Sequence, residues 1–284
     1  MCKSRECIVC KAASYNFGEN YDLSYMWPFN KKEESAPAPR LAKTILCIPG
    51  SWNSYEAFKD ALIVTTDAKY MMAALVLMDV EGKTFFEVEF SDHDDDMRRA
   101  FYLAGLVNQL QEDFLDEIAQ HKFVVFLSAD TGNPEAAKNI AKAAAVILKA
   151  GGIGVKIEST GLAFDKEIWL GLVENYEEHH LYKLFVLDCI VDRDNDTVYT
   201  CGMHNLGLRD TIVQGEEPED GIHLLRVFGY YQVVDKPIIQ HDQTFRADME
   251  SPVYRILEEV EQPFYEDDPF YNPYGRWRLL RVEE

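Results

Sequence analysis

The stretch TCGMHNLGLRD at residues 200–210 holds the side chains best suited to chemistry. It carries four candidate ligand-binding residues in a loop that contains two glycines: Cys201, His204, Arg209 and Asp210. A cysteine and a histidine can form a nucleophile–base pair. A reactive cysteine, however, needs an electropositive and accessible position, whereas Cys201 ends an apolar run. A structural turn is therefore the competing interpretation, and we assign no catalytic residue.

Two polar runs could hold a metal ion. The run SDHDDD at residues 91–96 offers carboxylates, but it lacks the glycine of a calcium loop and suits a helix N-terminus. The run EEHH at Glu177–His180 offers four possible ligands. We expect it at a helix C-terminus, where neighbouring residues point in different directions and histidines suit the helix dipole. Zinc-binding helices instead separate two histidines by four positions. We therefore predict no metal and no cofactor.

The 6 cysteines form two sets. Cys47, Cys189 and Cys201 fall in or beside predicted strands, where a thiol packs as a small apolar side chain. The other three lie in MCKSRECIVC, in which Cys7 and Cys10 have a zinc-like spacing. A structural zinc needs four ligands, and the sequence has no second such pair. Whether these N-terminal cysteines bind metal is left open.

Charge and composition exclude several classes of function. The chain has 284 residues, 47% of them hydrophobic, and a formal net charge of −21. Nucleic acids and anionic membranes require a basic surface, so neither is an expected partner. No apolar run reaches the ~18 residues that span a bilayer, and no secretory signal is recognisable. We expect a cytoplasmic protein with reduced thiols. Serine-elbow, Walker, zinc-protease and kinase motifs are absent.

The strongest structural signal is the run NPEAAKNIAKAAAVILKAGGIGVKIES at residues 133–159. Asn133 can cap a helix, Pro134 suits its first position, and Gly151 is a typical residue to end it. Alternating apolar residues at 153–157 then predict a strand with one buried face. The glycines follow a helix, whereas those of a phosphate-binding loop follow a strand, so we interpret them as a helix stop.

The remaining elements repeat one order on either side of this helix. Before it, we expect strand, helix, strand, strand, helix and strand at residues 44–48, 51–64, 73–80, 84–90, 97–119 and 123–127. After it, the same order is expected at residues 153–157, 165–176, 184–191, 197–201, 218–231 and 237–240. The order βαββαβ is typical of a ferredoxin-like fold.

We therefore predict an α+β protein in which two ferredoxin-like units pack as one body. The first unit comprises residues 41–131 and the second residues 152–245, with a connecting helix at residues 132–151. Residues 1–40 form an N-terminal arm and linker. Residues 246–284 form an aromatic and acidic tail that packs on the body.

Residues 200–210 also resemble a known motif. The pattern Thr-x-Gly-Met-x-x-Leu-Gly-Leu-x-Asp resembles the C-terminal motif of the bacterial family called domain of unknown function 4261. The alanine-rich helix with GGIGVKIESTG and the helix start DKEIW at residues 165–169 fit the same family, over roughly residues 44–280. The resemblance implies a bacterial cytoplasmic protein without an established activity, and it supplies no catalytic residues.

These observations lead to two functional hypotheses. The first is a non-enzymatic module that binds another protein, because the surface is acidic, the terminal segments are aromatic and catalytic motifs are missing. The second is a small-molecule binder or enzyme with a cleft between the units near Cys201, His204 and Arg209. A concave pocket with convergent polar groups favours the second hypothesis, and a flat apolar surface favours the first. The sequence does not indicate the oligomeric state.

Overall fold

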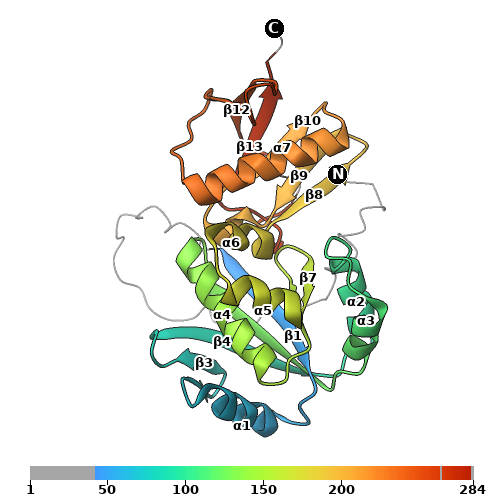
Figure 1. The fold of residues 1–284 in the computed structure, drawn as a ribbon, viewed down its shortest axis with the longest axis vertical. Helices are drawn as coiled ribbons and strands as arrows, with labels where there is room; N and C mark the ends of the chain where they lie inside the picture. The colour runs from blue at the N-terminus through green and yellow to red at the C-terminus, as the bar shows by residue number, and fades with distance from the viewer. Residues whose placement is uncertain (1–41, 263, 283–284) are drawn as a thin grey trace, which may run out of the picture.

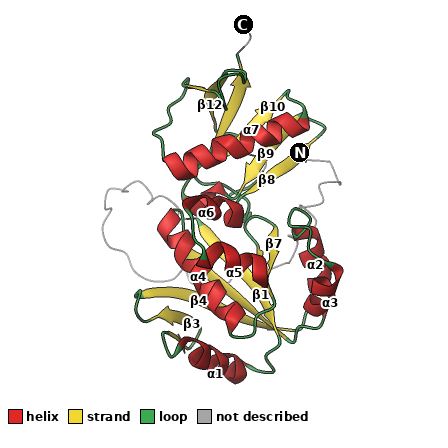
Figure 2. Ribbon diagram, in the orientation of Figure 1, coloured by secondary structure: helices red, strands yellow, loops and turns green. Residues whose placement is uncertain are grey.

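The computed structural model describes residues 42–262 and 264–282. Within these residues the protein is an α+β structure with seven α-helices and two β-sheets of seven and six strands (Figures 1 and 2). This confirms the predicted α+β class. The arm and linker predicted for residues 1–40 lie outside the described residues. No helix in the described ranges is long and apolar enough to cross a membrane.

Sheet A has seven antiparallel strands in the order β2-β3-β4-β5-β1-β6-β7. They are β1 (Lys43–Gly50), β2 (Tyr70–Ala73), β3 (Val76–Asp79), β4 (Thr84–Asp92), β5 (Phe123–Asp130), β6 (Gly154–Ile157) and β7 (Leu162–Asp165). The strand predicted over residues 73–80 is shorter than expected: Val76–Asp79 form β3, whereas Ala73 ends β2, the strand that pairs with it in a hairpin. The chain reverses at Ala74, whose φ of 51° is incompatible with a continuous strand.

Both faces of sheet A carry helices. Leu46 and Ile48 of β1 belong to one core with α1 (Tyr55–Thr66), α4 (Pro134–Lys149) and α5 (Lys166–Glu174). Between them, Cys47 points to the opposite face, where α2 (Met97–Ala104) and α3 (Glu112–Ala119) form a second core. The helix predicted over residues 97–119 is thus two helices, which Gly105–Gln111 separate.

Helix α4 forms as its sequence predicts. The side chain of Asn133 accepts a hydrogen bond of 2.8 Å from the Ala136 N–H, and Pro134 occupies the first turn. Ala137 and Ala144 are completely buried, because small side chains let the helix lie close to the sheet. The helix ends at Lys149, and Gly151 takes a left-handed φ of 119°.

The six-stranded sheet B has the order β11-β12-β13-β10-β9-β8. Its strands are β8 (Leu187–Asp192), β9 (Thr197–Cys201), β10 (Asp210–Gln214), β11 (Thr244–Phe245), β12 (Tyr254–Glu259) and β13 (Arg276–Arg281). Helix α7 (Pro218–Tyr230) covers one face through Leu224, Leu225 and Phe228. A π-helix, η3 (Tyr231–Asp235), continues α7. The strand predicted at residues 237–240 does not form.

The two ferredoxin-like units are not confirmed. Strand β6, which was expected to begin the second unit, pairs with β1, so the predicted division at residue 152 cuts sheet A. The segment predicted as a tail from residue 246 supplies β12 and β13, which complete sheet B. Element order misled because it contains no information on which distant strands pair. Helix α6 (Glu178–Phe185) also occupies residues that we expected to lead into a strand.

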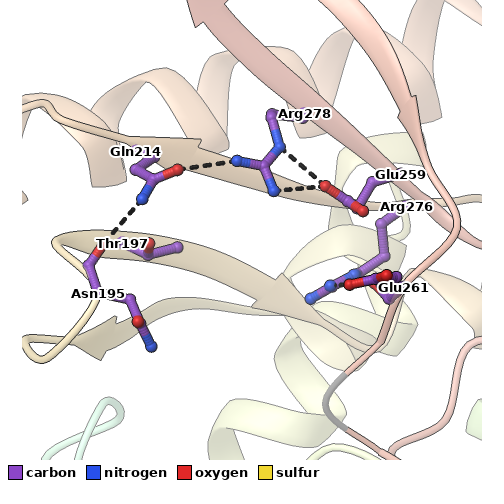
Figure 3. A network of polar contacts seen from close by, with 7 residues as sticks. All are labelled: Asn195, Thr197, Gln214, Glu259, Glu261, Arg276 and Arg278. Carbon is purple, nitrogen blue, oxygen red and sulfur yellow. Dashed lines mark hydrogen bonds and ion pairs between the residues drawn. The ribbon is translucent and has the colours of Figure 1, made fainter.

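Polar side chains tie the neighbouring strands of sheet B together (Figure 3). The Arg278 guanidinium binds Glu259 of β12, with Nε 2.8 Å from the carboxylate, and donates to the Gln214 side chain of β10 at 2.8 Å. Gln214 donates in turn to the Asn195 carbonyl at 3.1 Å, and Arg276 donates to the carbonyl of Glu261. Charged side chains thereby secure the C-terminal strand β13 between β10 and β12.

Gly202 tests how closely the turn after β9 packs against the rest of the protein. Its φ of +115° disfavours any other residue, and an added Cβ would collide with the Phe185 carbonyl and the Thr160 side chain. We expect Gly202→Ala to lower the free energy of unfolding by about 1–3 kcal/mol through backbone strain alone, measured by urea denaturation. The control is Gly171→Ala in α5, where an added Cβ meets nothing within 4 Å. That variant should gain about 0.5–1 kcal/mol from helix propensity. Equal stability of the two variants would contradict the assignment.

Candidate functional site

The predicted ligand-binding loop is a tight turn at the junction of the two sheets. It comprises the end of β9, the 3₁₀ helix η2 (Met203–Leu206) and the start of β10. Gly202 and Gly207 flank η2 with φ values of 115° and 75°, which glycine adopts at little cost. Of the four predicted residues, Cys201 is 2% exposed, His204 2% and Asp210 3%. The structure therefore places three of them inside the protein.

Arg209 lies apart from the other three. Its guanidinium carbon is 4.2 Å from the ring centroid of Trp277 in β13. One guanidinium nitrogen is 3.0 Å from the carboxylate of Glu258 in β12. A cation over an indole ring and beside a carboxylate has its charge satisfied within the protein. Arg209 thus joins the loop to sheet B.

The buried Asp210 side chain holds the loop together through hydrogen bonds. Its carboxylate accepts hydrogen bonds from the Thr200 hydroxyl at 3.1 Å, the Met203 N–H at 3.1 Å and the Asn272 side-chain amide at 2.6 Å. Burial raises the pKa of Asp210 to about 6, although these three donors oppose the shift. The same Asn272 amide donates to the Leu208 carbonyl at 3.0 Å. Asp210 and Asn272 therefore fix the loop to the C-terminal segment.

Asn205 fixes the other side of the loop to sheet A. Its side-chain oxygen accepts hydrogen bonds from the hydroxyls of Thr44 at 2.5 Å and Ser159 at 3.1 Å. Its amide donates to the Gly202 carbonyl at 2.9 Å. The Thr44 hydroxyl also lies 2.8 Å from that of Thr131. These partners were not predicted, because Thr44 and Ser159 are common polar residues that lie 161 and 46 positions from Asn205 and give no local signal.

The geometry does not assemble a cysteine–histidine pair. Neither ring nitrogen of His204 has a hydrogen-bond partner in the described part of the chain. Burial lowers the pKa of His204 to about 4, so its imidazole is neutral at pH 7. The Cys201 sulfur lies 3.9 Å from the Ser159 carbonyl. Three of the four predicted residues are thus buried, Arg209 lies apart from them, and their role in ligand binding stays a prediction.

A groove of about 650 Å³ lies elsewhere, beside α6, α7, η3 and β11. It is lined by His179, Val227, Tyr230, Tyr231, Val234, Asp235, Thr244, Phe245, Arg246 and Ala247. None of the four predicted residues lines it. Part of its wall is the π-helix η3, a rare conformation that is frequent at functional sites. Its polar residues come from distant segments, so no sequence motif marked it.

The EEHH run adjoins this groove, and its expected position was wrong. Glu177–His180 begins helix α6, with Glu177 as the N-cap residue, instead of ending a helix. Glu177 has extended backbone angles, and its carboxylate lies 3.3 Å from Nδ1 of His179. The ligand atoms of Glu177, His179 and His180 all lie within 4.8 Å of one another. Glu178 is not part of this cluster and pairs with Lys236 at 2.9 Å.

Replacing Asp210 tests the buried connection. The Tyr274 N–H donates to the Asn272 side-chain oxygen at 2.9 Å, so the Asn272 amide must face Asp210. In Asp210→Asn, the new side-chain oxygen can still accept from Thr200 and Met203. The new NH₂ group would then face the NH₂ group of Asn272, so that two donors meet without an acceptor. We expect the free energy of unfolding to fall by about 1–3 kcal/mol. Exposed Asp60→Asn should change it by less than about 0.5 kcal/mol. Similar values for the two variants would refute this role.

His204 gives a pH-dependent prediction. Its folded-state pKa of about 4 lies below its usual 6.5, so the stability it contributes is present above pH 6.5 and is lost as the pH falls toward 4. Asp210 acts oppositely, because the stability linked to its raised pKa is lost as the pH rises through about 6. Wild type should lose ~3 kcal/mol relative to His204→Leu between pH 7.5 and pH 4.

Urea denaturation of both proteins across this pH range measures the difference. The exposed His223→Leu is the matched control and should keep the wild-type pH dependence. Parallel curves for wild type and His204→Leu would show that His204 is not buried in its neutral form.

The chain was also compared with known proteins. No family model, curated protein or solved structure matches it. The resemblance of residues 200–210 to the family called domain of unknown function 4261 stays a prediction.

Proposed function

We propose that this protein is a non-enzymatic module that binds another protein on one face of sheet A. The observation that carries the proposal is a cross-strand row of Met71, Met78 and Phe85, hereafter the Met–Phe row. Met71 pairs with Met78 across β2 and β3, and Met78 pairs with Phe85 across β3 and β4. Phe85 is 65% exposed and Met71 40%. Large apolar side chains gathered on a surface are typical of protein-binding sites.

Strand alternation explains why the row faces outward. The neighbouring residues Met72, Leu77 and Phe86 pair in the adjacent register and pack into the core beneath α1 and α4. The Met–Phe row must therefore lie on the opposite face. Helices α2 and α3 cover that face farther along, over β5, β1 and β7, where Cys47, Val124 and Ala163 are buried.

The end of the sheet adds a second recognition element. Strand β2, with the sequence YMMA, is the last strand of sheet A among the described residues. Edge strands usually carry charges or proline that prevent pairing with another chain. The uncharged β2 lacks both and suits a partner strand that adds to the sheet.

The surrounding charges indicate the chemistry of the partner. Glu87 and Glu89 lie on the same face as the Met–Phe row, and the whole chain has a net charge of −21. Lys43 pairs with Glu87 at 2.7 Å. Glu89, two residues farther along β4, is then the nearest carboxylate of this strand to the Met–Phe row that does not pair with Lys43. The expected partner is an extended apolar segment flanked by lysine or arginine, because such charges would be complementary.

A small-molecule binder is the second candidate function, and the groove beside α7 favours it. Its volume of about 650 Å³ falls in the usual range for ligand sites, and His179, Asp235 and Arg246 supply polar groups to its wall. This groove is distinct from the loop of Cys201, His204 and Arg209, to which we first assigned a ligand. A cytoplasmic location, which the free thiols of Cys47 and Cys189 support, is common to both proposals.

Substitution of the Met–Phe row tests the first proposal. Proteins captured by the wild-type chain are identified, and the affinity of each purified candidate is measured by calorimetry. The double variant Met71→Thr/Phe85→Thr preserves strand propensity. It should lower the affinity for the true partner by at least about tenfold, because it removes the central apolar contacts. The matched control is Val64→Thr/Ile238→Thr, which alters residues 82% and 86% exposed outside this row.

Circular dichroism should show the same fold and melting temperature in both double variants. Unchanged affinity of every captured protein for the Met–Phe variant would reject the docking face. Concentration-dependent association of the wild type alone, measured by sedimentation and lost in that variant, would identify the partner as a second copy.

A further inference from the structure

We propose that Glu177, His179 and His180 form a binding site for a divalent transition metal, with zinc as the best fit, at the wall of the groove beside α7. Imidazole and carboxylate are ordinary zinc ligands, and three protein ligands leave a fourth position open. This site is independent of the docking face on sheet A.

The start of α6 brings the three side chains together. Glu177 lies just before the helix, and its backbone is extended, with φ −126° and ψ 154°. The direction of its side chain is therefore not set by the helical geometry of the residues that follow. Its carboxylate oxygen therefore reaches to 3.3 Å from Nδ1 of His179. Two ligands of a tetrahedral zinc ion with bonds of about 2.0–2.1 Å are about 3.3 Å apart. The pair already has the spacing that one shared ion requires.

Two backbone groups hold the His180 ring in place beside His179 and Glu177. Its Nδ1 lies 3.0 Å from the Leu172 carbonyl and 3.3 Å from the Glu177 N–H. The Leu172 carbonyl can only accept a hydrogen bond and the Glu177 N–H can only donate one, so the two contacts suit opposite tautomers of the ring. In the tautomer that donates from Nδ1 to the Leu172 carbonyl, Nε2 is the nitrogen that can bind a metal, and metal-binding histidines commonly donate their other N–H to a backbone carbonyl in this way.

The groove provides space for a molecule bound to the ion. His179 belongs both to the three-residue cluster and to the wall of the groove. Its ring packs against His180 at 4.4 Å and approaches Tyr230, another wall residue, at 6.0 Å between centroids. Arg246 supplies a positive charge to the same wall. A small carboxylate or phosphate is therefore the class of ligand that could occupy the open metal position.

Metal titration of the full-length chain tests the site. The protein is stripped with a chelator and titrated with ZnCl₂ by calorimetry, and with CoCl₂ by absorption spectroscopy. The N-terminal cysteines could also bind these ions, but cobalt–thiolate bonds give a near-ultraviolet charge-transfer band that nitrogen and oxygen ligands lack. We expect one equivalent of cobalt with visible d–d bands and without the thiolate band.

Matched variants assign that equivalent to the cluster. His179→Ala and Glu177→Gln should each lower the affinity for cobalt by at least about tenfold. The control variants His223→Ala and His241→Ala, which change exposed residues, should bind cobalt as wild type does. His180→Ala also removes the contact with Leu172, so the partly exposed His179 decides the outcome if that variant is unstable. Wild-type binding by His179→Ala, or cobalt bound only through thiolates, would overturn the proposal.

Discussion

The buried hydrogen bonds of Asn205 are the interaction on which the arrangement of the two sheets depends. A buried amide is stable only when its donors and acceptor are satisfied, and Asn205 finds partners in Thr44 of sheet A, in Ser159 after β6 and in its own turn. Asp210 and Asn272 do the same for the C-terminal segment. The turn between β9 and β10 therefore has one position that satisfies all of these groups.

The same constraint explains why side chains of reactive types are buried in this turn. Cys201, His204 and Asp210 belong to a turn whose value lies in being enclosed by both sheets. Enclosure keeps His204 uncharged and removes Cys201 from solvent. The surfaces that we propose as binding sites lie instead at the periphery, on the β2 edge of sheet A and around the start of α6. Residue type alone cannot distinguish these two environments.

Local features of the fold were predictable, and long-range pairing was not. Asn133, Pro134 and Gly151 bound α4 because capping and backbone preference act within a few residues. The strand after it was expected to have one solvent-exposed face, yet Lys156 is 7% exposed and pairs with Glu158 at 2.5 Å. Strand β7 follows β6 in a hairpin, but β1 on the other side comes from a segment more than 100 residues earlier, so the burial of both faces is not encoded locally. Likewise, the start of α6 could not be predicted at the EEHH run. Its N-cap is Glu177, and glutamate is not one of the residue types that usually mark an N-cap.

The position of β13 inside sheet B has a consequence for synthesis on the ribosome. All strands of sheet A precede residue 166, so its core can form while the chain is still being made. In sheet B, β13 lies between β10 and β12, and its pairing with β10 is parallel. Strand β10, which pairs with β9 on one side, must therefore wait without its other neighbour until residues 276–281 have left the exit tunnel. Sheet B therefore closes late in synthesis, and a chain that stops before residue 276 lacks the strand that joins β10 to β12.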